Sequence, residues 1–136
     1  MSKELKVGMT HEIERETTEE MSAQKVYPHV PNVYATRAMV GHIEEVCADM
    51  VLPHLAEGQQ TVGTGMKFKH MAATPLGMKV RFSAKLTAVD GPKLAFEVEG
   101  FDAVDKIGEA THYRFIIDAE KFNSSVAKKA QKASLS

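Results

Sequence analysis

Hydrophobic and polar positions alternate with two different periods along this chain, and the change of period separates one predicted helix from the predicted strands. From about Ala35 to Leu55, apolar residues recur every three or four positions, which predicts a long amphipathic helix. Pro53 and Gly58 fall near and just after its end, where helices commonly stop. The period then becomes two and predicts four strands, over residues 61–73, 78–89, 94–101 and 107–118.

The regions outside this pattern are less regular. Residues 5–15 alternate roughly and predict a further strand, whereas the stretch over about residues 17–34 carries Pro28 and Pro31 and predicts a loop or lid. The tail is expected to begin as a short helix and to fray over about residues 129–136. One helix packed across a five-stranded antiparallel sheet is an α+β fold of the hot-dog type, and we expect a single domain over residues 1–136. A free edge strand in such a sheet favours pairing with a second copy of the chain, and so a homodimer.

Composition and charge exclude several classes of function. Hydrophobic residues make up 43% of the chain, charged residues 26%, and the formal net charge is -1, which is ordinary for a soluble domain. No nucleic-acid or membrane partner is therefore expected, and no run approaches the roughly 18 apolar residues of a membrane span. The N-terminus lacks the apolar segment of a secretory signal, and Cys47 is the only cysteine. We expect a cytoplasmic protein without an intrachain disulfide.

Glu44 occupies an unusual position in the predicted helix. At about 100° per residue it shares the apolar face with Val40 and Cys47, whereas Glu45 falls on the opposite face with His42 and Asp49. Because burying an unpaired carboxylate costs several kcal/mol, Glu44 must be paired, protonated or exposed to a pocket. The ordinary alternative is a surface glutamate at the edge of the apolar stripe.

Two further side chains can join Glu44 in a reactive site. His70 has the strand phase of Val62, Met66 and Phe68, although a satisfied core histidine would show the same pattern. Thr36 lies at the start of the helix on the same stripe, where an N-cap role is the ordinary alternative. A hydroxyl, a carboxylate and an imidazole around an apolar slot are typical of acyl transfer, and the helix N-terminus offers N–H groups for an oxyanion.

Several other residues have simpler interpretations. Gly63 and Gly65 either let strand backbone approach a substrate or mark a bulge or bend. Cys47 is expected to be a small core side chain and not a nucleophile. The remaining histidines show no metal-ligand spacing, so no metal is predicted; these are His11, His29, His42, His54 and His112.

Four segments of the chain resemble one known family. "VYATRAMVGHIEEVCADMVLPHL", "VGTGMKFKHMAATPLG", "GFDAVDKIGEATHYRFIID" and "EKFN" are similar to the fluoroacetyl-CoA thioesterase-like branch of the hot-dog superfamily, over about Lys6 to Lys128. The resemblance implies a homodimer that hydrolyses acyl-CoA thioesters near the subunit interface, with no cofactor besides the CoA of the substrate. The resemblance also implies that Thr36, Glu44 and His70 are catalytic and that Gly63 and Arg114 contact the substrate.

The resemblance leaves the acyl group and the chemical route open. Tyr27 and Val30 stand in the lid where the fluoroacetate-specific members have phenylalanines, so they are expected to contact a different small or medium acyl group. His70 is expected to be the general base, with Glu44 orienting it or activating water or Thr36. Thr36 either attacks covalently or positions water, and a third route has Glu44 attacking directly through an anhydride. The alternative functions are a non-catalytic acyl-CoA binding protein and a hot-dog enoyl-CoA hydratase.

Overall fold

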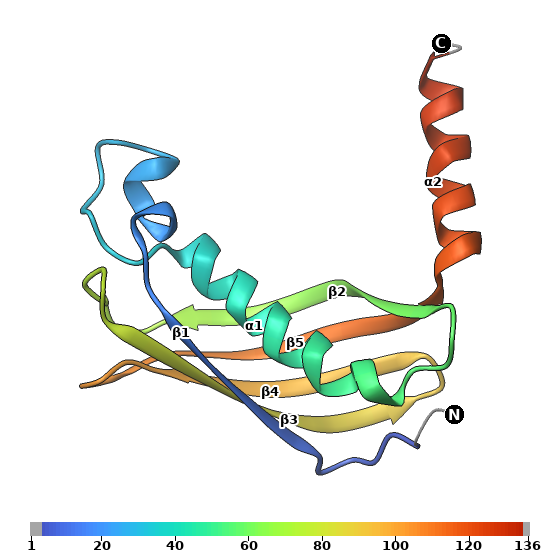
Figure 1. Ribbon diagram of the computed structural model, residues 1–136, viewed down its shortest axis with the longest axis horizontal. Coiled ribbons are helices and arrows are strands. Elements are labelled where there is room, and N and C mark those ends of the chain that lie inside the picture. Colours follow the sequence, from blue (N-terminus) through green and yellow to red (C-terminus); the bar gives the residue numbers. More distant parts are fainter. Residues whose placement is uncertain (1–3, 135–136) are drawn as a thin grey trace.

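A helix lies across one face of an antiparallel sheet in the computed structural model, which describes residues 4–134 (Figure 1). The central helix is α1 (Thr36–Val51). The strands are β1 (Thr10–Glu16), β2 (Gln59–His70), β3 (Lys79–Asp90), β4 (Lys93–Phe101) and β5 (Lys106–Asp118), in the spatial order β1-β3-β4-β5-β2. Short 3-10 turns cover Glu19–Met21, Ala23–Lys25 and Leu52–His54. The predicted α+β hot-dog architecture with five strands is confirmed.

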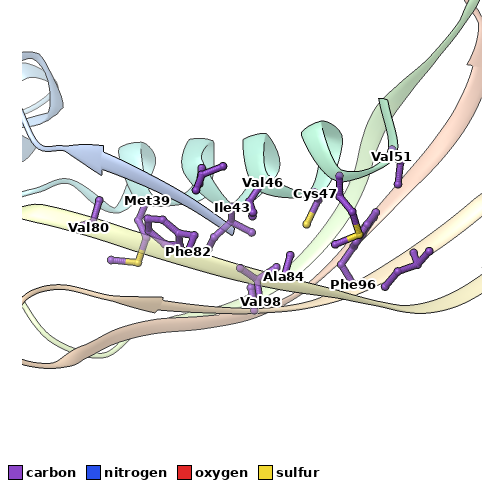
Figure 2. Packing of buried hydrophobic residues seen from close by; sticks show 14 of the residues in the cluster. Met39, Ile43, Val46, Cys47, Val51, Val80, Phe82, Ala84, Phe96 and Val98 are labelled. Atoms are coloured by element: carbon purple, nitrogen blue, oxygen red, sulfur yellow. The ribbon is translucent and has the colours of Figure 1, made fainter. Parts of the chain in front are cut away.

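The core fills the space between α1 and the sheet. Met39, Ile43 and Val46 point from the helix toward Phe82 and Phe96 on the strands (Figure 2), and all five side chains are buried. Continuous burial of these side chains excludes water from the helix–sheet contact and supplies most of its stability. Cys47 belongs to the same cluster, which confirms that it is a core side chain.

The buried stripe of α1 is rotated relative to the sequence-based expectation. His42 was expected on the charged face, yet it is buried and pairs with the hydroxyl of Tyr34. The reason is β1, which packs along this flank of the helix: Arg15 bonds Glu45 at 2.5 Å, and His11 bonds Asp49 at 2.6 Å. The other flank of α1, which carries Thr36 and Glu44, is therefore the open one.

A bulge in β2 changes which residues share a face. The pairing register shifts between Gly63 and Gly65, so Gly63 pairs with Arg114 while Met66 pairs with His112 and His70 with Gly108. Arg114, His112 and Gly108 lie on the helix-facing side of β5, because every second residue of a strand faces the same way. Gly63 and His70 therefore also face the same way, although a separation of seven residues would place them on opposite faces of a regular strand. The bulge interpretation of the glycines is confirmed. The expectation that Val62 shares the face of His70 is wrong, because Val62 precedes the bulge and pairs with Phe115.

Both ends of the chain differ from their predicted form. β1 begins only at Thr10, and Val7 is 61% exposed, because the chain turns at Gly8, whose φ is positive and whose N–H bonds the carbonyl oxygen of Leu86 on β3. Helix α2 (Ala119–Ser134) continues β5 and stands away from the sheet (Figure 1), so the fraying expected from residue 129 is not seen up to Ser134. The last two residues lie outside the described part. Between residues 4 and 134, no helix combines the length and the apolar character needed to cross a membrane.

Candidate active site

Thr36 and His70 form a hydrogen-bonded pair at the start of α1. The N-cap residue is Ala35, which is extended and makes no side-chain cap, so Thr36 is the first helical residue and does not cap the helix. Its Oγ1 lies 2.9 Å from Nδ1 of His70, the last residue of β2. With Nδ1 unprotonated, the hydroxyl donates to the imidazole, which is the geometry needed for proton removal from Thr36. Phe68 provides an apolar wall, with its ring centroid 6.2 Å from that of His70.

Glu44 forms a second cluster with Gly63 and Arg114. Its Oε2 is 3.8 Å from Nη1 of Arg114, and a Cβ placed on Gly63 would lie 3.0 Å from the same oxygen. The Glu44 side chain is 47% exposed and the Arg114 side chain 8%, so a buried cation faces a carboxylate that reaches solvent. Glu44 is thus a half-exposed carboxylate at the edge of the apolar stripe with a long contact to Arg114, and it is not a buried unpaired charge.

His112 holds Arg114 in place, a role that the sequence did not reveal. Its Nδ1 lies 2.9 Å from the carbonyl oxygen of Gly65, and its Nε2 lies 3.2 Å from Nη1 of Arg114. Burial lowers the pKa of His112, and the positive charge of Arg114 also lowers it. Burial likewise lowers the pKa of Arg114, although Glu44 favours its charged form. The sequence signal for this role is the alternation along β5, which places His112 and Arg114 on the same face of the strand.

The two clusters share a face but do not meet within one chain. Thr36 and Glu44 are eight residues apart on α1, about 12 Å along the helix axis. Gly63 and His70 are seven residues apart on β2, about 23 Å of extended strand. Among residues 4–134, no hydrogen bond or ion pair joins Glu44 to His70. One chain therefore offers two half-sites, a hydroxyl–imidazole pair and a carboxylate–guanidinium pair.

The segment over about residues 17–34, which the sequence predicts to be a loop or lid, is fastened near Thr36 and His70. Arg37, next to Thr36, donates from Nη2 to the carbonyl oxygens of Glu20 and Ser22, both at 3.0 Å. Tyr27 is 56% exposed, and the carbonyl of Val30 accepts a bond of 3.0 Å from the side chain of Gln24. The two predicted substrate contacts thus lie on a segment whose base is fixed beside Thr36.

Two other kinds of reactive site can be assessed. Burial raises the pKa of the Cys47 thiol to about 12, which keeps it protonated and unreactive at neutral pH. Within the described residues, no three His, Cys, Asp or Glu side chains converge into a cluster that could hold a metal ion.

Comparison with known sequences gives a consistent match. The family model for the fluoroacetyl-CoA-specific thioesterase matches residues 17–120. The fluoroacetyl-CoA thioesterase of Streptantibioticus cattleyicolor is 41% identical over 103 residues, which span 76% of this chain and 74% of that protein.

Comparison with solved structures extends the match to the backbone. A structure of the fluoroacetyl-CoA thioesterase FlK is 34% identical with a TM-score of 0.90, and the match covers 93% of this chain and 98% of that one. A variant of the same enzyme in complex with acetyl-CoA has a TM-score of 0.87 at 34% identity, covering 92% and 98%. A thioesterase superfamily member from Thermus thermophilus is 27% identical with a TM-score of 0.89, covering 96% and 97%.

Proposed function

Because the chain belongs to the fluoroacetyl-CoA-specific thioesterase family, we propose that it hydrolyses a small or medium acyl-CoA to the free acid and CoA. Thioester hydrolysis follows from the family and from the curated relative. The observation that supports it in this chain is the 2.9 Å contact between the Thr36 hydroxyl and the His70 imidazole at the N-terminus of a helix. Cytoplasm, where acyl-CoA thioesters are made and consumed, is the compartment we propose.

The Thr36–His70 pair performs the proton transfer in this proposal. His70 removes a proton either from Thr36 or from a water held by Thr36, and the resulting oxygen attacks the thioester carbonyl. The first N–H groups of α1 have no partner within the helix and can stabilise the oxyanion that develops. The C–S bond then breaks, and the CoA thiolate leaves and takes up a proton. In the covalent route, water hydrolyses the ester on Thr36 in a second step.

We propose that a second copy of the chain completes the site. In the sheet formed by residues 4–134, β2 is an edge strand beside β5, so its outer backbone groups can pair with another strand. If two β2 strands pair antiparallel about an axis midway between Gly63 and His70, His70 of the partner subunit lies opposite Gly63. The Glu44 carboxylate of one chain then approaches the hydroxyl–imidazole pair of the other, where it can orient the imidazole or activate water.

The lid supports a substrate other than fluoroacetyl-CoA. Tyr27 and Val30 differ in size and polarity from the phenylalanines that the resemblance predicts at these positions. We therefore propose that these two residues contact the acyl group and favour another short or medium chain.

Release of CoA thiol from a panel of acyl-CoAs, followed with a thiol-specific colour reagent, tests this function. The panel runs from acetyl-CoA and fluoroacetyl-CoA to octanoyl-CoA, with the Thr36→Ala variant as the matched control. We expect thiol release by the wild-type protein from at least one short or medium thioester, and far slower release by the variant. Tight acyl-CoA binding without thiol release would instead support the non-catalytic binding protein.

A further inference from the structure

His112 is a buried histidine that takes no part in the chemistry described above. It is 2% exposed, and both of its ring nitrogens are engaged. The Gly65 carbonyl can only accept, so Nδ1 must donate to it. The guanidinium of Arg114 can only donate, so Nε2 must accept from it. Both partners are satisfied by one form alone, the neutral imidazole with its proton on Nδ1.

The contacts of Arg114 show what this imidazole controls. Nε of Arg114 donates to Oγ1 of Thr61 at 2.9 Å, and Nη2 donates to the carbonyl of Thr61 at 3.0 Å. Nη1 donates to His112 at 3.2 Å and remains 3.8 Å from Oε2 of Glu44. A charge-assisted bond between these groups would be about 2.7–2.9 Å. Nη1 carries two N–H groups, and the bond of one of them to His112 holds the guanidinium in the orientation that leaves this longer distance to Glu44.

His112 also fixes the bulge in β2. Its Nδ1 bonds the carbonyl of Gly65, the residue where the pairing register resumes after the shift. That shift places Gly63 on the same face as His70, which a regular strand of this length would not do. The His112 imidazole therefore bonds both Arg114 and the β2 bulge at Gly65, the two features that shape the Glu44 half-site.

We propose that His112 is a positioning residue for thioester hydrolysis, which holds the β2 bulge and keeps Arg114 from capturing the Glu44 carboxylate. This inference rests on the proposed function, because there the Glu44 carboxylate must stay free to act on the His70 imidazole or on water. His112 touches neither substrate nor reacting atoms and acts through Arg114 and Gly65.

Three substitutions separate the two bonds of His112. His112→Gln keeps an acceptor for Arg114, His112→Asn keeps a donor for Gly65, and His112→Phe keeps neither. We expect His112→Phe to lower kcat for the best thioester about 10- to 100-fold with KM little changed, because a misplaced carboxylate affects the chemical step. The His112→Gln variant should have a higher kcat than His112→Asn, because its side chain still accepts a hydrogen bond from the Arg114 guanidinium. His11→Gln, on β1 at the sheet edge opposite β2, is the matched control and should retain wild-type kcat.

Two readouts make the inference refutable. Unchanged kcat in His112→Phe, or a ranking of kcat that simply follows thermal stability among the three variants, would overturn it. Imidazole nitrogen chemical shifts of the wild-type protein at pH 7 should show His112 neutral and protonated on Nδ1. An imidazolium, or a proton on Nε2, would overturn it too. Absence of thiol release by the wild-type protein would be a failure of the proposed function, and the nitrogen shifts would still decide the state of His112.

Discussion

Replacing Gly63 with alanine should impair hydrolysis while leaving the fold intact. The added methyl would lie 3.0 Å from Oε2 of Glu44, and 3.4 Å from both Nη1 of Arg114 and Cε1 of His112. To regain ordinary contact, the carboxylate oxygen must move by about 0.4 to 1 Å. A displacement of this size at a reacting group can cost roughly 100-fold, so we expect kcat to fall about 10- to 100-fold.

The stability of the Gly63→Ala variant should change little. The methyl meets the end of a half-exposed side chain that can rotate, and Gly63 has no positive φ that alanine would resist. Alanine also restricts the unfolded chain, which is worth about 0.4–1 kcal/mol in favour of folding. We expect the free energy of unfolding to stay within about 1 kcal/mol of wild type.

Gly65→Ala is the matched control on the same strand. A methyl there would meet only Cδ2 of Tyr113 at 3.6 Å, an ordinary contact on the outer side of the sheet. The assay is thiol release from the best acyl-CoA, with urea unfolding of the same samples. Equal kcat in both alanine variants would refute the reasoning, as would a loss of activity in Gly63→Ala that is accompanied by unfolding.

Three further predictions concern other parts of the molecule. Thr36→Ala should lose most of the kcat and Thr36→Ser retain most of it, with unfolding free energies within about 0.5 kcal/mol of wild type because the exposed Thr36 side chain caps nothing. Tyr34→Phe leaves a buried nitrogen of His42 without its partner, which should cost about 1–3 kcal/mol in urea unfolding, and adding His42→Leu should recover part of it. Burial lowers the pKa of His42 and of His112 below 6.5, so below that pH the unfolded chain binds more protons than the folded one. The free energy of unfolding should therefore fall from pH 7.5 to pH 5.5, and a flat profile would contradict this sign.

Periodicity was sufficient for α1 and for strands β2 to β5, because each buries one face against the same core. Glu44 and His70 could be selected because each interrupts an apolar pattern with an ionisable group. The positions of β1 and of the His42 side chain could not be predicted, because they depend on a strand that approaches the helix from a distant part of the chain.

The bulge in β2 limited what could be inferred about the site. A shift of one residue reverses the face of every side chain that precedes it, so a regular alternation misplaced Val62 and hid the shared face of Gly63 and His70. From the sequence, nothing was inferred for His112 beyond its lack of metal-ligand spacing, because its partners, Gly65 and Arg114, come together only once β2 and β5 are paired.

Complementation between two inactive variants would test most directly whether the half-sites of two chains act together. His70→Ala and Glu44→Gln chains with different affinity tags are co-expressed, and mixed dimers are isolated by tandem purification. In a mixed dimer, one of the two sites would combine an intact Glu44 from one chain with an intact Thr36 and His70 from the other. We predict about half of the wild-type kcat per dimer. Mixed dimers as inactive as either parent would show that the two chains do not share a site.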